Sequence, residues 1–124
     1  MDSRTLADKL ARLLWEKKGE EILIMDLREI TPIADFFILC SVDTDIQARA
    51  MVHYIEDQLR PEGIRPWHVE GGHETNWVLL DFVTVVVHLF RPETRAFYHI
   101  EGLWGDAGMT EINDSTYKDS GHVA

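Results

Sequence analysis

Cysteine is almost absent from this sequence. Its single cysteine, Cys40, excludes a disulfide within one chain. A chain of 124 residues can bury roughly two-thirds of the surface that its unfolded state exposes, so a hydrophobic core alone can stabilise the fold. Cys40 follows the apolar run 36–39. This position predicts a buried thiol in a protein of a reducing compartment.

Basic residues are also scarce. Twelve Lys and Arg stand against 22 Asp and Glu, which gives a formal net charge of −10, and Lys17-Lys18 is the only basic cluster. Proteins that bind nucleic acids gain much of their affinity by neutralising phosphates with Lys and Arg, so direct binding of RNA or DNA is not expected. Two interpretations of the charge stay open: it complements a basic partner, or it only maintains solubility.

Long apolar runs are missing as well. No stretch approaches the roughly 20 apolar residues that a membrane-spanning helix needs. The start, Met1 to Arg4, lacks the basic region and apolar core of a secretory signal. We therefore expect a soluble, cytoplasmic protein that makes no contact with membranes.

Apolar spacing predicts an α/β fold with a mixed five-stranded sheet flanked by helices. A helix between the second and third strands requires a parallel crossover, whereas the closely spaced last strands favour antiparallel pairing. We expect one domain over residues 1–106 and a disordered, small and polar tail over 107–124. The predicted helices are 3–18, 44–60 and 92–103, and the predicted strands are 22–25, 36–42, 66–70, 77–82 and 84–90.

The sequence offers little for catalysis or metal binding. No pair of histidines has the i, i+4 spacing of a zinc-binding helix, and no CxxC occurs, so we expect no metal site. We expect His88 to be a satisfied core or boundary residue. Ser41 lacks a nucleophile elbow, and Gly71-Gly72 is not a phosphate-binding loop. The histidines and acids weighed as ligands are His68, Glu70, His73, Glu74, His88, His99 and His122.

One enzymatic alternative stays open. Four carboxylates, Asp26, Asp35, Asp43 and Asp45, lie near predicted strand ends, where nucleotide-transferring enzymes hold divalent metals. Helix capping and turns explain three of them equally well.

The predicted strand 77–82 has two different faces. Strand alternation places Val78, Leu80 and Phe82 on a purely apolar face, which is typical of core. The other face combines Trp77, Leu79 and Asp81, an aromatic anchor beside an acid, as in binding hot spots. The alternative is that Trp77 simply packs under the first or last helix.

Five segments of the sequence carry recognisable motifs. They are ADFFILCS (34–41), VEG (69–71), WVLLD (77–81), VVVHLF (85–90) and RAFYHIEGLWGD (95–106). In this order and spacing they resemble the ribosomal silencing factor (Iojap-like) family. The resemblance covers about residues 4–107, and the combined motifs are highly specific.

The resemblance implies a nucleotidyltransferase-like fold without transferase activity. We also expect no cofactor. It implies binding to the large ribosomal subunit through protein fourteen of that subunit. The bound factor would block joining of the small subunit and repress translation when nutrients are short, and the free factor would form a homodimer. By matching position, the partner-binding residues are Trp77, Leu79 and Asp81, with Glu70 as an addition.

The sequence departs from the family pattern in three places. Ile46 replaces a basic residue, and Val42 stands where glycine is common. Val83-Thr84 replaces a small, acidic turn between the last two strands. Since β-branched residues resist positive φ angles, the geometry of that hairpin is the feature most affected.

Overall fold

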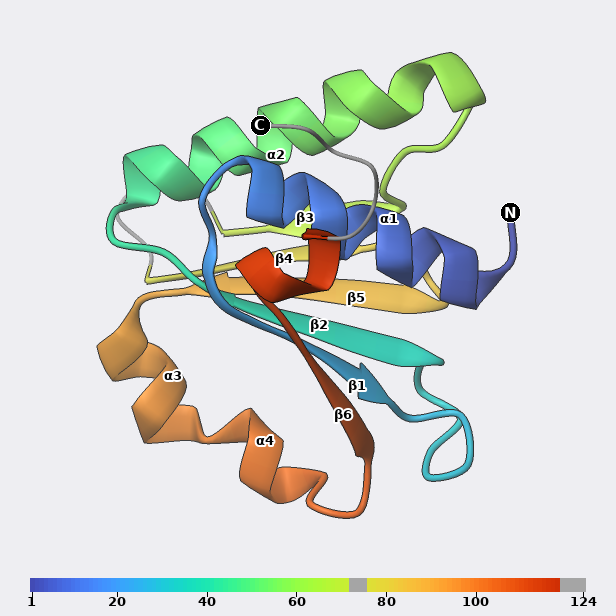
Figure 1. Ribbon diagram of the computed structural model, residues 1–124, viewed down its shortest axis with the longest axis vertical. Coiled ribbons are helices and arrows are strands. Elements are labelled where there is room, and N and C mark those ends of the chain that lie inside the picture. Colours follow the sequence, from blue (N-terminus) through green and yellow to red (C-terminus); the bar gives the residue numbers. More distant parts are fainter. Residues whose placement is uncertain (72–75, 119–124) are drawn as a thin grey trace.

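A six-stranded mixed sheet forms the centre of the protein in the computed structural model, which describes residues 1–71 and 76–118 (Figure 1). The strands are β1 (Glu20–Asp26), β2 (Phe36–Ser41), β3 (His68–Glu70), β4 (Trp77–Asp81), β5 (Val85–Phe90) and β6 (Gly108–Ile112). The helices are α1 (Ser3–Glu16), α2 (Asp45–Leu59), α3 (Pro92–Tyr98) and α4 (Ile100–Leu103), with 3₁₀ turns η1 (Arg60–Glu62) and η2 (Asp114–Tyr117).

The strand order is β3-β4-β5-β2-β1-β6. β2 and β5 pair in parallel, and the other four pairs are antiparallel. α2 lies between β2 and β5 in the chain, as a parallel connection requires. The predicted mixed α/β architecture is therefore confirmed, but the predicted count of five strands is wrong.

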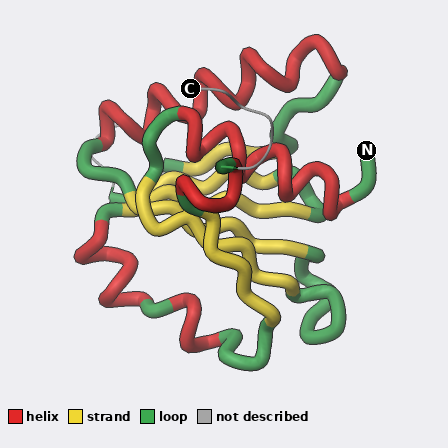
Figure 2. Tube along the Cα trace, viewed as in Figure 1, coloured by secondary structure: helices red, strands yellow, loops and turns green. Residues whose placement is uncertain are grey.

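Helices cover both faces of the sheet and create two cores (Figures 1 and 2). α1 and α2 pack on one face around a large cluster that includes Leu10, Ile55 and Leu80. α3 and α4 lie along the opposite face, where Ile100 joins a smaller cluster with Phe90. β5 is central and buried along its whole length, which explains its continuous apolar sequence. Within the described residues, no helix is long and apolar enough to cross a membrane.

The N-terminus of α2 is closed by reciprocal hydrogen bonds. Thr44 is the N-cap, and its hydroxyl accepts a hydrogen bond from the Gln47 backbone N–H at 3.0 Å. The Gln47 side chain accepts in turn from the backbone N–H of Asp43, at 2.8 Å. This reciprocal arrangement satisfies amides at the start of the helix.

The prediction of a disordered tail from residue 107 is wrong for most of that segment. Residues 108–112 form β6 on the edge beside β1, and η2 follows. Ile112 is the only buried residue of β6, so the strand gives a weak apolar signal. Tertiary contacts hold the segment: Asp114 accepts a hydrogen bond from Trp15, and the Tyr117 ring lies 4.6 Å from that indole. Residues 119–124 lie outside the described part.

The last predicted helix is interrupted. His99 has a left-handed φ of 46° and separates α3 from α4, so a continuous helix to Leu103 is a wrong prediction. The His99 backbone N–H closes α3 on the Arg95 carbonyl at 2.8 Å. The turn redirects the chain while Ile100 packs into the smaller core.

Candidate functional site

β4 presents the two different faces that its sequence predicts. Val78 and Leu80 are buried in the larger core. Trp77, Leu79 and Asp81 are each half-buried on the opposite face of the sheet, the side that carries α3 and α4. The alternation is therefore confirmed, and the mixed face is accessible from outside.

Neighbouring strands extend this face. Leu79 lies directly opposite Glu70 on β3 and His88 on β5. Directly opposite residues of paired strands project to the same side of a sheet. The structure thus brings the exposed Glu70 beside Leu79, as the sequence-based site requires. We call Glu70, Trp77, Leu79 and Asp81 the β4 face.

Trp77 lies in an aromatic environment. Its indole Nε1 donates a hydrogen bond to His88 Nδ1 at 3.1 Å. The ring centroids of Tyr98 and Phe90 lie 4.9 and 5.4 Å away. The alternative that Trp77 packs against the last helix is correct in part, since Tyr98 belongs to α3, but Trp77 stays only partly buried.

His88 is a buried histidine, as expected. It is 4% exposed, and burial lowers its pKa from 6.5 to about 4, so the ring is neutral near pH 7. Because Nδ1 accepts from Trp77, the ring proton is assigned to Nε2. Nε2 is buried without a hydrogen-bond partner in the described structure, so the expected satisfaction is incomplete.

Asp81 lies at the end of β4 and supports the β4–β5 turn. Its Oδ1 accepts a hydrogen bond from the Val83 backbone N–H at 2.7 Å. Val83 adopts a φ of 73°, and the Thr84 N–H bonds the Phe82 carbonyl at 2.9 Å. A β-branched residue is strained in this conformation. The departure at Val83-Thr84 therefore leaves the hairpin intact but stores strain beside the β4 face.

Sequence reasoning missed an apolar surface next to Trp77. Phe97, Leu103 and Tyr98 are 80%, 74% and 51% exposed. Tyr98 contacts both Trp77 and Phe97, so these two exposed rings continue outward from the β4 face. The available signal was the density of large apolar residues in 97–104, which exceeds what one side of a short helix can bury.

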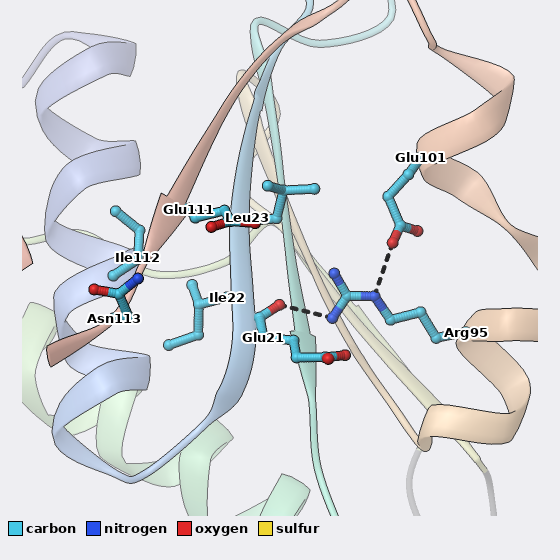
Figure 3. Close-up of a pocket in the computed structure, with 8 residues that line it drawn as sticks. All are labelled: Glu21, Ile22, Leu23, Arg95, Glu101, Glu111, Ile112 and Asn113. Carbon is cyan, nitrogen blue, oxygen red and sulfur yellow. Dashed lines mark hydrogen bonds and ion pairs between the residues drawn. The ribbon is translucent and has the colours of Figure 1, made fainter. Parts of the chain in front are cut away.

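Arg95 ties α3 to the sheet beside this surface (Figure 3). Its Nη1 donates to the Glu21 carbonyl at 2.7 Å and to Ser41 Oγ at 2.9 Å, and its Nε donates to Glu101 at 3.1 Å. The guanidinium borders a hollow of about 460 Å³ that Glu111 also lines. The charged residues that line this hollow are three glutamates and Arg95. Their net charge is negative, so the hollow is poorly suited to anions.

The four aspartates of the enzymatic alternative do not meet. Asp26 pairs opposite Phe36 and lies with Asp35 at the start of β2, whereas Asp43 and Asp45 follow its end. A six-residue strand spans about 20 Å, which is too far for shared metal ligation. Asp26 is instead paired with Arg28, whose hydrogen bond lowers the pKa of the carboxyl.

Among the other candidate ligands, His68 and Glu70 meet as a pair, with 3.0 Å between His68 Nε2 and Glu70 Oε1. No group of three or more His, Cys, Asp or Glu suited to a metal occurs within residues 1–71 and 76–118. His73, Glu74 and His122 lie outside the described residues. Cys40 is buried as predicted, and this burial raises its thiol pKa to about 12.

The comparisons with known proteins point in one direction. The family model described as "Ribosomal silencing factor during starvation" matches residues 1–123. The Ribosomal silencing factor RsfS of Bacillus subtilis is 35% identical over 113 residues, which cover 91% of this chain and 96% of the relative. A Mus musculus protein, named "Mitochondrial assembly of ribosomal large subunit protein 1", is 31% identical over 78% of this chain and 44% of its own length.

Solved structures agree with the sequence comparisons. A crystal structure from Chromobacterium violaceum superposes with a TM-score of 0.79 at 30% identity, over 85% of this chain and 88% of that one. A second, from Bacillus halodurans, gives 0.75 at 29% identity, over 89% of this chain and all of the other. Fold and sequence agree, and the chain belongs to the ribosomal silencing factor family.

Proposed function

We propose that this protein binds the large ribosomal subunit through the β4 face and sterically prevents joining of the small subunit. Translation is thereby repressed under nutrient limitation. The observation that carries the proposal is that Trp77, Leu79 and Asp81 share one side of β4 and are each only partly buried there, in a chain of this family. The name of the mouse relative refers to the large ribosomal subunit, which supports the same target.

The contact is made to a basic protein of the large subunit, its protein fourteen. Trp77 supplies the apolar anchor, while Asp81 and the exposed Glu70 supply charge at the rim. The net charge of −10 favours association with a basic surface. A standard interface buries roughly 800 Å² per partner, about a tenth of the 7404 Å² that this chain exposes.

The repression involves no bond making. The bulk of the bound protein occupies space that the small subunit requires, so the protein acts in the cytoplasm without catalysis, metal or cofactor. The separation of Asp26 and Asp35 from Asp43 and Asp45 supports this over the enzymatic alternative. Calorimetric titration with magnesium and a nucleoside triphosphate separates the two: saturable heat would favour the enzyme.

Cosedimentation with isolated large subunits tests the face. Trp77→Ala is expected to abolish comigration while its circular dichroism spectrum stays that of the wild type. Ile46→Ala is the matched control, because Ile46 is 68% exposed at the start of α2, on the opposite side of the sheet. Undiminished comigration of Trp77→Ala would refute the assignment of the β4 face.

Two further measurements test the rest of the proposal. Adding the protein to large subunits before small subunits is expected to reduce the fraction of joined ribosomes, and Trp77→Ala is expected to restore it. We also propose that the free protein is a homodimer, since Phe97 and Leu103 leave apolar surface uncovered in one chain. Light scattering that gives the monomer mass at micromolar concentration would contradict the dimer.

A further inference from the structure

His88 and Trp77 form a pair that joins a buried strand to the docking surface. We propose that His88 is a positioning residue that fixes the Trp77 indole in its docking orientation by accepting the indole N–H. This inference rests on the proposed function, because it concerns the same face. The proposal is based on the hydrogen bond of 3.1 Å from Trp77 Nε1 to His88 Nδ1.

The acceptor is held rigidly. His88 lies on β5, which is paired on both sides, with Leu79 opposite on β4 and Leu39 opposite on β2. Its ring contacts Phe37 at 4.8 Å between centroids, and the side chain is 4% exposed. A side chain enclosed in this way keeps one rotamer, so the position of Nδ1 is set by the sheet.

Trp77 needs such an acceptor. Trp77 is only partly buried, and its other ring neighbours, Phe90 and Tyr98, make aromatic contacts that allow sliding and rotation. A hydrogen bond adds a direction that these contacts lack. An anchor that is already oriented avoids the entropy cost of ordering a large side chain when the partner binds.

The chemistry of β5 supports a specific role for the histidine. It is the only polar residue in Val-Val-Val-His-Leu-Phe, and its Nε2 is buried without a partner in the described structure. Burying an imidazole with one unpaired nitrogen costs stability that an aliphatic residue would avoid. The bond to Trp77 is the one hydrogen bond that the ring makes among the described residues. We therefore attribute the polar residue at this position to the orientation of Trp77.

Three variants test the proposal. His88→Leu removes the acceptor, His88→Asn keeps an oxygen close to the position of Nδ1, and Trp77→Phe keeps an aromatic ring without the donor. Affinity for isolated large subunits is measured by sedimentation, and exchange of the Trp77 indole N–H with solvent is measured by ¹⁵N NMR. The indole N–H of Trp67, which is 75% exposed, provides the reference within the same protein.

We expect His88→Leu and Trp77→Phe to bind about five- to tenfold more weakly, as the loss of one net hydrogen bond predicts. His88→Asn is expected to recover most of the affinity. The Trp77 indole N–H is expected to exchange more slowly than that of Trp67 in the wild type, and to lose this protection in His88→Leu. In the Trp77→Phe background, His88→Leu is expected to cause no further loss.

Several outcomes would overturn the proposal. Full affinity of a folded His88→Leu variant would do so, as would an equal loss in the Trp77→Phe background, which would indicate a merely structural role. If His88→Leu fails to fold, full affinity of Trp77→Phe overturns it instead. Full binding by Trp77→Ala overturns the proposed docking face as well, whereas the exchange measurement still reports the hydrogen bond independently of the ribosome.

Discussion

As the pH falls, the buried His88 is expected to lower the free energy of unfolding of this protein before the carboxylates of the protein do. The unfolded side chain takes up a proton as the pH falls through 6.5, whereas burial keeps the folded side chain neutral until about 4. Between these values the unfolded state binds more protons, so the free energy of unfolding falls as the pH falls. Each unit between the two pKa values corresponds to about 1.4 kcal/mol. The expected loss is about 2 kcal/mol at pH ~5 and about 3 kcal/mol at pH ~4.

Two assays check this expectation. Urea denaturation at a series of pH values gives the stability profile, and His88→Asn, which cannot titrate, is expected to lack the loss between pH ~6.5 and ~4. NMR titration of the His88 ring in the native protein gives the pKa directly. A His88 transition near pH ~6.5 in the folded protein, or identical stability profiles for the two proteins, would refute the reasoning.

Three further predictions concern strain, anchoring and charge. Val83→Gly relieves the strained φ of 73° and is expected to raise the free energy of unfolding by about 0.5–1 kcal/mol in urea titrations; a lower stability would contradict the strain. Arg95→Met removes hydrogen bonds to Glu21, Ser41 and Glu101 and is expected to cost about 2–4 kcal/mol, whereas Arg65→Met at an exposed position should cost little. Binding to large subunits is expected to weaken with added salt, and Asp81→Asn is expected to make the affinity less dependent on salt concentration. An affinity that does not change with salt would mean that the acidic surface only maintains solubility.

Local pattern determined much of this protein. Period-two alternation assigned Trp77, Leu79 and Asp81 to one side of β4 and Val78 and Leu80 to the other, because successive side chains of a strand point to opposite faces. The predicted helix 44–60 begins at Thr44, which is the residue that caps α2, since its hydroxyl satisfies a free amide there. The combined motifs of five segments identified the family, which the comparisons confirmed.

The sequence pattern did not predict the edge strand β6 or the break between α3 and α4. β6 is largely exposed, so its sequence carries no alternation, and its place is decided by pairing with β1 and by the contact of Tyr117 with Trp15. The left-handed residue at this turn is His99, and no glycine or proline stands there to predict a turn. The aspartates at the two ends of β2 looked alike in sequence, and only the strand between them shows that they lie apart.

The sequence by itself therefore determined which strand carries the candidate site and which of its faces is available, because alternation is a property of the backbone. Only the tertiary structure decided what surrounds Trp77. The acceptor of the Trp77 indole N–H is on His88, 11 residues away in the sequence. The ring of Tyr98 belongs to α3, which follows β5. Such contacts depend on how strands pair and where a helix turns back, and neither is encoded in the spacing of residues within one segment.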